Sequence, residues 1–169
     1  NLVHRFNGHS HPITAVTASC QYVATGSADG AIYIWGLHND HELVGTLTGH
    51  AKSITALQVT AHGRRIISSS VDKTACEWNV VDCSLRRRWC AEDGTTRQHK
   101  QQHHHAPVRS IAISPCSKWA YIGSDDGAIS GWNCGARDTP LSAVPHIRTF
   151  HRHEAAIRHV TVSSDGTFV

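Results

Sequence analysis

The sequence contains no methionine, and no apolar run reaches the roughly 18 residues that a membrane-spanning helix needs. It therefore predicts a protein that does not cross a membrane by a helix. The first residues, 1–5, hold neither an initiator methionine nor the apolar stretch of a signal peptide. We expect the chain to be an internal piece of a longer, intracellular protein.

Paired cysteine motifs are also missing. None of the six cysteines belongs to a C-x-x-C pair, which argues against a zinc site or a redox motif and favours reduced thiols. The alternative is a metal site, because Cys76, Cys83 and Cys90 recur every seven residues near His99 and His103. We prefer small cysteines on strands and in turns, and we predict no metal and no cofactor.

The sequence has little charge of either sign. The formal net charge is +3, which permits a nucleic-acid partner but does not require one. The positive charge is concentrated between residues 86 and 109, where Lys and Arg outnumber Asp and Glu. The remainder of the chain is close to neutral.

Internal repeats are the main feature of the sequence. Four histidines each precede an apolar residue by four positions, in the pairs His9/Ile13, His50/Ile54, His104/Val108 and His153/Ile157. Three aspartates each precede a tryptophan by six, in the pairs Asp29/Trp35, Asp72/Trp78 and Asp126/Trp132. Apolar and polar residues alternate between these marks, and Asp29-Gly30 and Asp126-Gly127 are favoured hairpin turns. No segment has helical periodicity, so the sequence predicts an all-β protein.

These motifs resemble the WD40 repeat family, which implies a β-propeller of four-stranded blades. We expect about three and a half blades of a longer ring, whose other blades would come from the same longer chain. The repeats would cover residues 8–38, 49–90, 104–135 and, truncated, 152–169. A polar, His-rich loop would be inserted at 91–105.

The resemblance also implies a buried polar network in each blade. In the family an aspartate bonds a histidine, a Ser or Thr on the second strand and a tryptophan on the third. The matching residues are His9, Thr25, Asp29 and Trp35; His50, Ser68, Asp72 and Trp78; and His104, Asp126 and Trp132, with Ile122 in place of the third hydroxyl. The same spacing recurs in successive blades, whereas catalysis needs one activated site, so we interpret these residues as structural and predict no enzyme.

The leading functional hypothesis is a non-catalytic scaffold for protein–protein interactions in a multi-subunit complex. The family places partner contacts at one end of the blades, which here implies His11, Ala28, Lys52, Val71, Arg109 and Asp125. Resemblance to the family supports this function, rather than any single site.

Two alternatives remain. An RNA–protein assembly factor would use a basic segment formed by Arg86, Arg87, Arg88, Arg97 and Lys100. Short matches at 66–74 and 121–127 resemble WD40 subunits of ribosome-assembly complexes. A metal-dependent or hydrolytic propeller is the third hypothesis.

Overall fold

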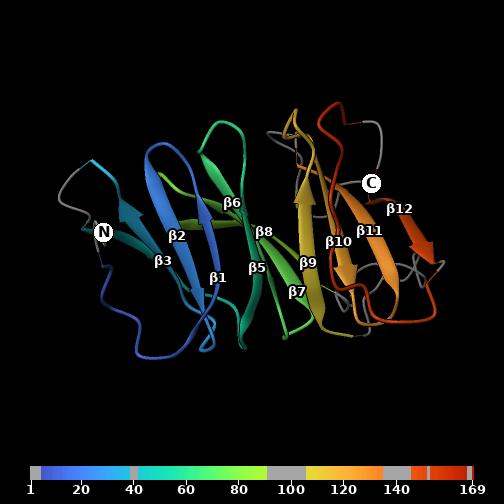
Figure 1. Cartoon of the computed structure of the whole chain (residues 1–169), viewed down its shortest axis with the longest axis horizontal. Helices are drawn as coiled ribbons and strands as arrows, with labels where there is room; N and C mark the ends of the chain where they lie inside the picture. The colour runs from blue at the N-terminus through green and yellow to red at the C-terminus, as the bar shows by residue number, and fades with distance from the viewer. Residues whose placement is uncertain (1–4, 39–41, 91–105, 135–145, 152, 167–168) are drawn as a thin grey trace.

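A computed structural model describes residues 5–38, 42–90, 106–134, 146–151, 153–166 and 169. It contains three antiparallel sheets, each of four strands in a simple meander (Figure 1). The first sheet comprises β1 (Ile13–Ala18), β2 (Tyr22–Ser27), β3 (Ile32–Gly36) and β4 (Leu43–Leu47). The second comprises β5 (Ile54–Val59), β6 (Arg65–Ser70), β7 (Thr74–Asn79) and β8 (Ser84–Cys90). The third comprises β9 (Val108–Ile113), β10 (Trp119–Ser124), β11 (Ala128–Asn133) and β12 (His146–His151).

The predicted all-β architecture is confirmed, and a partial propeller accounts for the three sheets. No helix occurs in the described parts of the chain, and none therefore is long and apolar enough to cross a membrane. The inner strands β1, β5 and β9 stand in a row, and each sheet fans outward from its inner strand (Figure 1).

Turn chemistry sets the ends of the central strands. Gly30 and Gly127 adopt the left-handed conformation, with φ of 89° and 79°, in the β2–β3 and β10–β11 hairpins. The second sheet has Lys73 in the same place, also with a positive φ of 72°. These three hairpins lie at one end of the sheets, beside the segments that lead into β1, β5 and β9, and we call this end the hairpin end. Backbone bonds join the two sets there, such as Ala28 N–H to the Pro12 carbonyl at 2.9 Å.

Neighbouring sheets pack face to face through apolar residues. Between the first and second sheets the core includes Ile32, Ile34, Ile54, Ile66 and Trp78, all at most 1% exposed. Between the second and third sheets it includes Ile67, Trp89, Val108, Ile122 and Cys134. Each such face removes several large side chains from water, which is the main stabilising contribution to a stacked array of blades.

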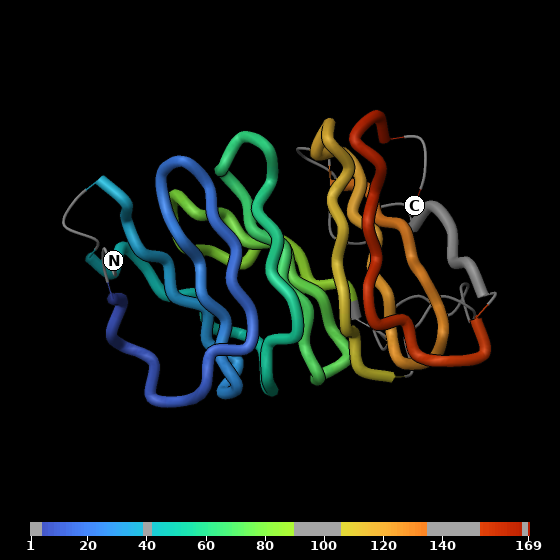
Figure 2. Tube along the Cα trace, in the orientation of Figure 1, coloured from blue at the N-terminus to red at the C-terminus, as the bar shows by residue number. Residues whose placement is uncertain are grey.

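The segment after β12 packs against the third sheet and runs alongside β9 (Figure 2). Ile157 donates its N–H to the Ser124 carbonyl at 2.9 Å and packs at Gly123. Ile54 of β5 packs in the same way at Gly26 of the first sheet, where an added Cβ would lie 2.6 Å from its Cγ2. The segment after β12 therefore presents Ile157 to the preceding sheet as β5 presents Ile54, although none of its described residues is in a strand.

Lys73 gives a test of the hairpin geometry. A non-glycine residue in the left-handed region destabilises the folded state by about 1–2 kcal/mol. Glycine removes this strain, but part of the gain is lost because glycine also makes the unfolded chain more flexible. We expect Lys73→Gly to raise the free energy of unfolding by about 0.5–1 kcal/mol, measured from denaturant midpoints. Gly30→Ala should lower it, because the new Cβ would lie 2.7 Å from the His50 carbonyl oxygen. A loss of stability in Lys73→Gly would contradict this account.

Candidate functional site

The second sheet contains a continuous chain of polar contacts between its histidine and its tryptophan. His50 Nδ1 lies 2.9 Å from Asp72 Oδ2, and His50 Nε2 lies 2.7 Å from Ser68 Oγ. The Trp78 indole N–H donates to the same Ser68 oxygen at 2.7 Å. One tautomer satisfies every group: Nδ1–H donates to the carboxylate, and Nε2 accepts the serine proton. The aspartate thus reaches the serine and the tryptophan only through the histidine, rather than bonding all three directly.

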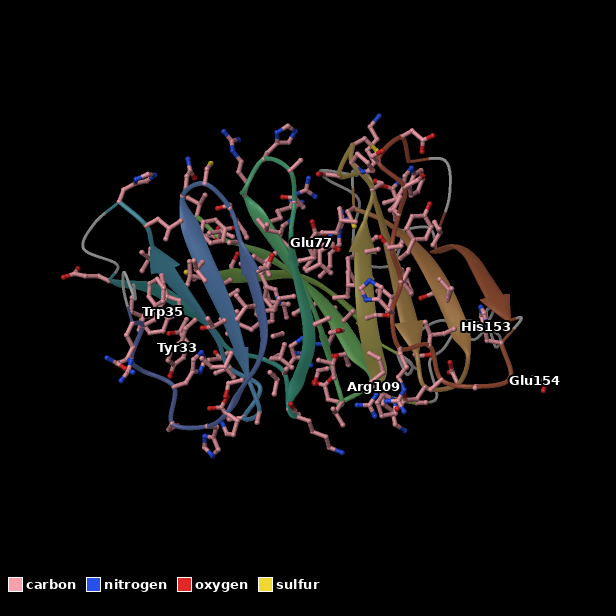
Figure 3. The ribbon with its side chains drawn as sticks, in the orientation of Figure 1. Tyr33, Trp35, Glu77, Arg109, His153 and Glu154 are labelled. Atoms are coloured by element: carbon pink, nitrogen blue, oxygen red, sulfur yellow. The ribbon has the colours of Figure 1, made fainter. Side chains whose placement is uncertain are left out.

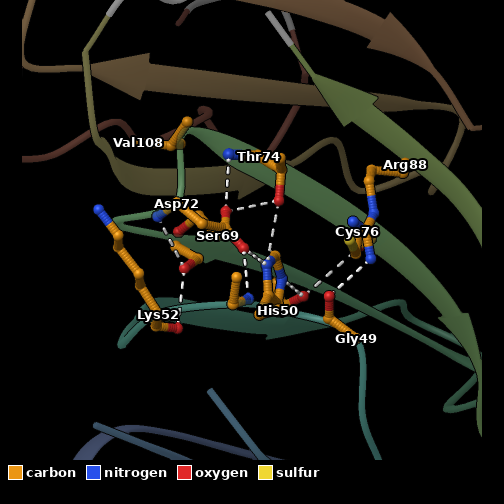
Figure 4. Close-up of polar contacts among 12 residues, drawn as sticks. Gly49, His50, Lys52, Ser69, Asp72, Thr74, Cys76, Arg88 and Val108 are labelled. Carbon is orange, nitrogen blue, oxygen red and sulfur yellow. Dashed lines mark hydrogen bonds and ion pairs between the residues drawn. The ribbon is translucent and has the colours of Figure 1, made fainter. Parts of the chain in front are cut away.

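Asp72 is held by more than the histidine. The backbone N–H groups of Ala51 and Thr74 each donate to its carboxylate at 2.9 Å, and the Thr74 hydroxyl donates at 2.6 Å (Figure 4). Burial works to raise the pKa of Asp72, but the hydrogen bonds from His50, Thr74 and Ala51 outweigh it and hold the pKa well below its usual range. The carboxylate therefore stays ionised and pins the β6–β7 hairpin to the segment that enters β5.

The first sheet has only part of this network. His9 Nε2 lies 2.7 Å from Thr25 Oγ1, and the Trp35 indole donates to the same oxygen at 2.8 Å. Asp29 does not join them: it accepts the Ala31 N–H at 2.9 Å and lies 3.3 Å from Nδ1 of the exposed His11. His9 Nδ1 has no hydrogen-bond partner within the described part of the chain. The structure therefore brings together three of the four residues expected here.

The third sheet satisfies its tryptophan in another way. Ile122 is 1% exposed and offers no hydroxyl, so the Trp132 indole donates to Ser130 Oγ on its own strand at 2.8 Å. Asp126 accepts the Ala128 N–H at 3.0 Å and the Ser124 hydroxyl. His104 lies outside the described residues. Ser130 was missed in the sequence, although a hydroxyl two residues before the tryptophan was a visible signal.

The candidate contacts at the hairpin end fall into three groups. His11 and Lys52 are exposed, whereas Ala28 and Val71 are half-buried. Arg109, which Figure 3 labels, forms an ion pair with Asp125. Its Nε lies 2.9 and 2.8 Å from the two carboxylate oxygens, and its Nη2 lies 2.6 Å from Oδ2. Hydrogen bonding from the Arg109 guanidinium lowers the pKa of Asp125. The charges of these two residues therefore largely neutralise each other.

The candidate basic segment is divided between interior and surface. Arg87 is 5% exposed and its guanidinium lies 3.5 Å from Glu77, so the expectation that it offers charge to a phosphate is wrong in this structure. Arg86 is half-buried, and the exposed Arg88 donates to the Gly49 carbonyl at 2.6 Å. Arg97, Lys100 and the rest of the insert at 91–105 lie outside the described residues.

Five cysteines are free thiols in the part of the chain whose side chains are described: Cys20, Cys76, Cys83, Cys116 and Cys134. Cys20 and Cys116 are exposed, while burial raises the pKa of both Cys76 and Cys134 to about 12. Among the residues that the structure describes, no three or more His, Cys, Asp or Glu side chains are placed to hold a metal ion. Two residues of the metal site considered from the sequence, His99 and His103, lie outside the described part of the chain.

The depressed pKa of Asp72 gives a pH-dependent test. Its unfolded pKa is about 3.9, so its contribution to stability is complete at neutral pH and is lost as the pH falls below about 4. We expect Asp72→Ala to lower the free energy of unfolding by about 1–3 kcal/mol for each buried group left without a partner, and to flatten the acid limb of the stability profile. Denaturant unfolding between pH 2 and 8 measures both effects.

Asp125→Ala is the matched control for that variant. Its partner Arg109 is one-third exposed, so the ion pair contributes at most about 1 kcal/mol. Equal losses of stability in the two variants would contradict the placement of Asp72 as the central acceptor.

Comparison with known proteins agrees with this framework. The sequence model described as "WD domain, G-beta repeat" matches residues 1–36, 41–79 and 90–133. The chain is 28% identical to a ribosome biogenesis protein WDR12 homolog of Drosophila virilis over 83% of its length, and 32% identical to a p21-activated protein kinase-interacting protein 1-like of Gallus gallus over 76%. It spans 32% and 31% of those two relatives.

Two further similarities extend the comparison. Over 87% of its length the chain is 29% identical to apoptotic protease-activating factor 1 of Mus musculus, of which it spans 10%. The computationally designed Ika4 protein has the same fold, with a TM-score of 0.71, 22% identity and coverage of 92% of this chain and 82% of that one. The three matched repeats span most of the sequence, and each contains the first three strands of one sheet. The chain therefore belongs to the WD domain, G-beta repeat family, whose members are generally non-catalytic scaffolds for protein interactions.

Proposed function

We propose that this chain is a non-catalytic scaffold that holds protein partners within a multi-subunit complex. Family membership supports this proposal, and so does the burial of the Ser68 hydroxyl. Ser68 is completely buried, and its oxygen is engaged by both His50 and Trp78. A hydrolase needs a hydroxyl that substrate can reach, so this His–Asp–Ser set is framework, and the protein's function belongs to its surface.

The hairpin end is the surface we assign to partners. His11 and Lys52 are exposed there, and both stand on segments that the buried network fixes from beneath. The Lys52 carbonyl accepts the Ser70 hydroxyl at 3.0 Å, so the backbone under its ammonium group is anchored. A rigid backbone that carries exposed charged side chains loses little entropy when a partner binds.

Site-specific photo-crosslinking tests this assignment. We expect a crosslinking residue at Lys52 in the full chain to capture a defined partner within the complex. The same residue at Lys118, an exposed lysine at the opposite end of the sheets, should not. Capture from position 118 alone, or equally from both, would reject the hairpin end as the partner surface.

An RNA–protein assembly factor is the second candidate. One similarity favours it: the Drosophila virilis relative is named a ribosome biogenesis protein. Within the described part of the basic segment, Arg88 is the exposed arginine on β8. We expect either function to be exercised inside the cell.

Salt-dependent RNA titration separates the two functions. If β8 contacts single-stranded RNA, Arg88→Gln should weaken binding and reduce the slope of log K against log salt by about 0.7 for the lost phosphate contact. Arg64→Gln removes an equally exposed arginine on the turn before β6 and should leave the slope unchanged. No RNA affinity at low salt, or equal effects of the two substitutions, would remove the RNA function.

A further inference from the structure

A fully buried carboxylate lies between the second and third sheets. Glu77 of β7 is 0% exposed, and Figure 3 labels it in the gap between these sheets. Arg65 of β6 donates to Glu77 Oε1 at 2.7 Å, and Arg87 of β8 lies 3.5 Å from Oε2. The strands on both sides of β7 thus each supply one cation. Neither the sequence motifs nor the polar network described above includes these three residues as a group.

The same two arginines also reach across to the third sheet. Arg65 donates to the Cys134 carbonyl, and Arg87 donates to the Asn133 carbonyl at 3.2 Å. Both acceptors lie where β11 ends. The Arg65–Glu77–Arg87 cluster therefore links two sheets: its charges pair within the second sheet, and its arginines also hydrogen-bond to the end of β11 in the third.

The joint between the first and second sheets has uncharged residues at the positions equivalent to this cluster. Strand register makes Ile34 the counterpart of Glu77, since Ile34 pairs with Gly45 as Glu77 pairs with Arg87. Tyr22 is likewise the counterpart of Arg65, and its hydroxyl donates to the Gly63 carbonyl of the second sheet at 2.8 Å. Two joints with the same strand register thus differ in chemistry, and among the described residues that pack in them only the second has a fully buried carboxylate.

This difference has an energetic consequence. A buried ion pair contributes little more than well-packed apolar residues of similar volume, but removal of one partner leaves a buried charge that is costly. We infer that the Arg65–Glu77–Arg87 cluster is a charge-dependent lock between the second and third sheets. Loss of the Glu77 charge releases the third sheet while the uncharged joint between the first and second sheets stays closed.

Hydrogen exchange of Glu77→Gln in the full chain tests the lock. Glutamine keeps the shape and one acceptor but removes the charge that two guanidinium groups require. We expect amides of β9, β10 and β11 to exchange about tenfold faster or more, and amides of β1, β2 and β3 to exchange at an unchanged rate. Glu154→Gln neutralises an exposed carboxylate and should change neither group. A uniform acceleration, or none, would overturn the inference.

A second variant keeps the test decisive if Glu77→Gln does not fold. The triple substitution Arg65→Tyr, Glu77→Ile and Arg87→Gly installs the uncharged set of the first joint. It removes all three charges together, so we expect it to fold and to exchange in β9, β10 and β11 more slowly than Glu77→Gln. If the triple variant exchanges as fast as Glu77→Gln, or if both fail to fold, the uncompensated charge is not the cause and the lock is rejected.

Discussion

A buried hydroxyl on the second strand of a sheet is the contact on which the rest of each complete repeat depends. In the second sheet it is Ser68, and in the first it is Thr25. Its single oxygen accepts the tryptophan indole from the third strand and bonds the histidine that precedes the first strand. An indole and an imidazole are costly to bury unpaired, so this oxygen fixes three segments at once. Once these segments are held in place, so are the apolar residues through which neighbouring sheets pack.

The third sheet shows which part of this arrangement is obligatory. Its second strand offers Ile122, yet the Trp132 indole is still paired, through Ser130. Trp132 also stacks on Trp89 of the second sheet, with ring centroids 5.8 Å apart. In each sheet the indole of the matching tryptophan donates to a hydroxyl, and the strand that supplies this acceptor can change. Because Ile122 has no hydroxyl, β10 supplies no acceptor at that position, and the Trp132 indole donates within β11 instead.

Local chemistry explains why so much of the fold could be predicted from the sequence. The Asp-Gly hairpins and the alternating strands depend on residues close together in the chain, and they form where predicted. The errors concern residues whose partner lies elsewhere. Asp29 turns to His11 instead of His9, and Arg87 turns inward to Glu77. A count of basic residues along β8 could not show this, because the direction of Arg87 is set by a carboxylate on β7 and a carbonyl at the end of β11.

The repeats are therefore alike inside each sheet and unlike between sheets. Within each sheet the aspartate accepts the backbone N–H two residues further on, in the hairpin before the third strand, so its spacing to the tryptophan recurs in the sequence. At a joint, each face has to satisfy one particular neighbour, and Tyr22 and Arg65 do so with a hydroxyl and a guanidinium at equivalent positions. The half-buried Arg65 guanidinium would lose one hydrogen-bond partner against a sheet that lacked the Cys134 carbonyl. Chain order places the sheets, and the chemical differences at the joints make each joint specific to the two sheets that form it.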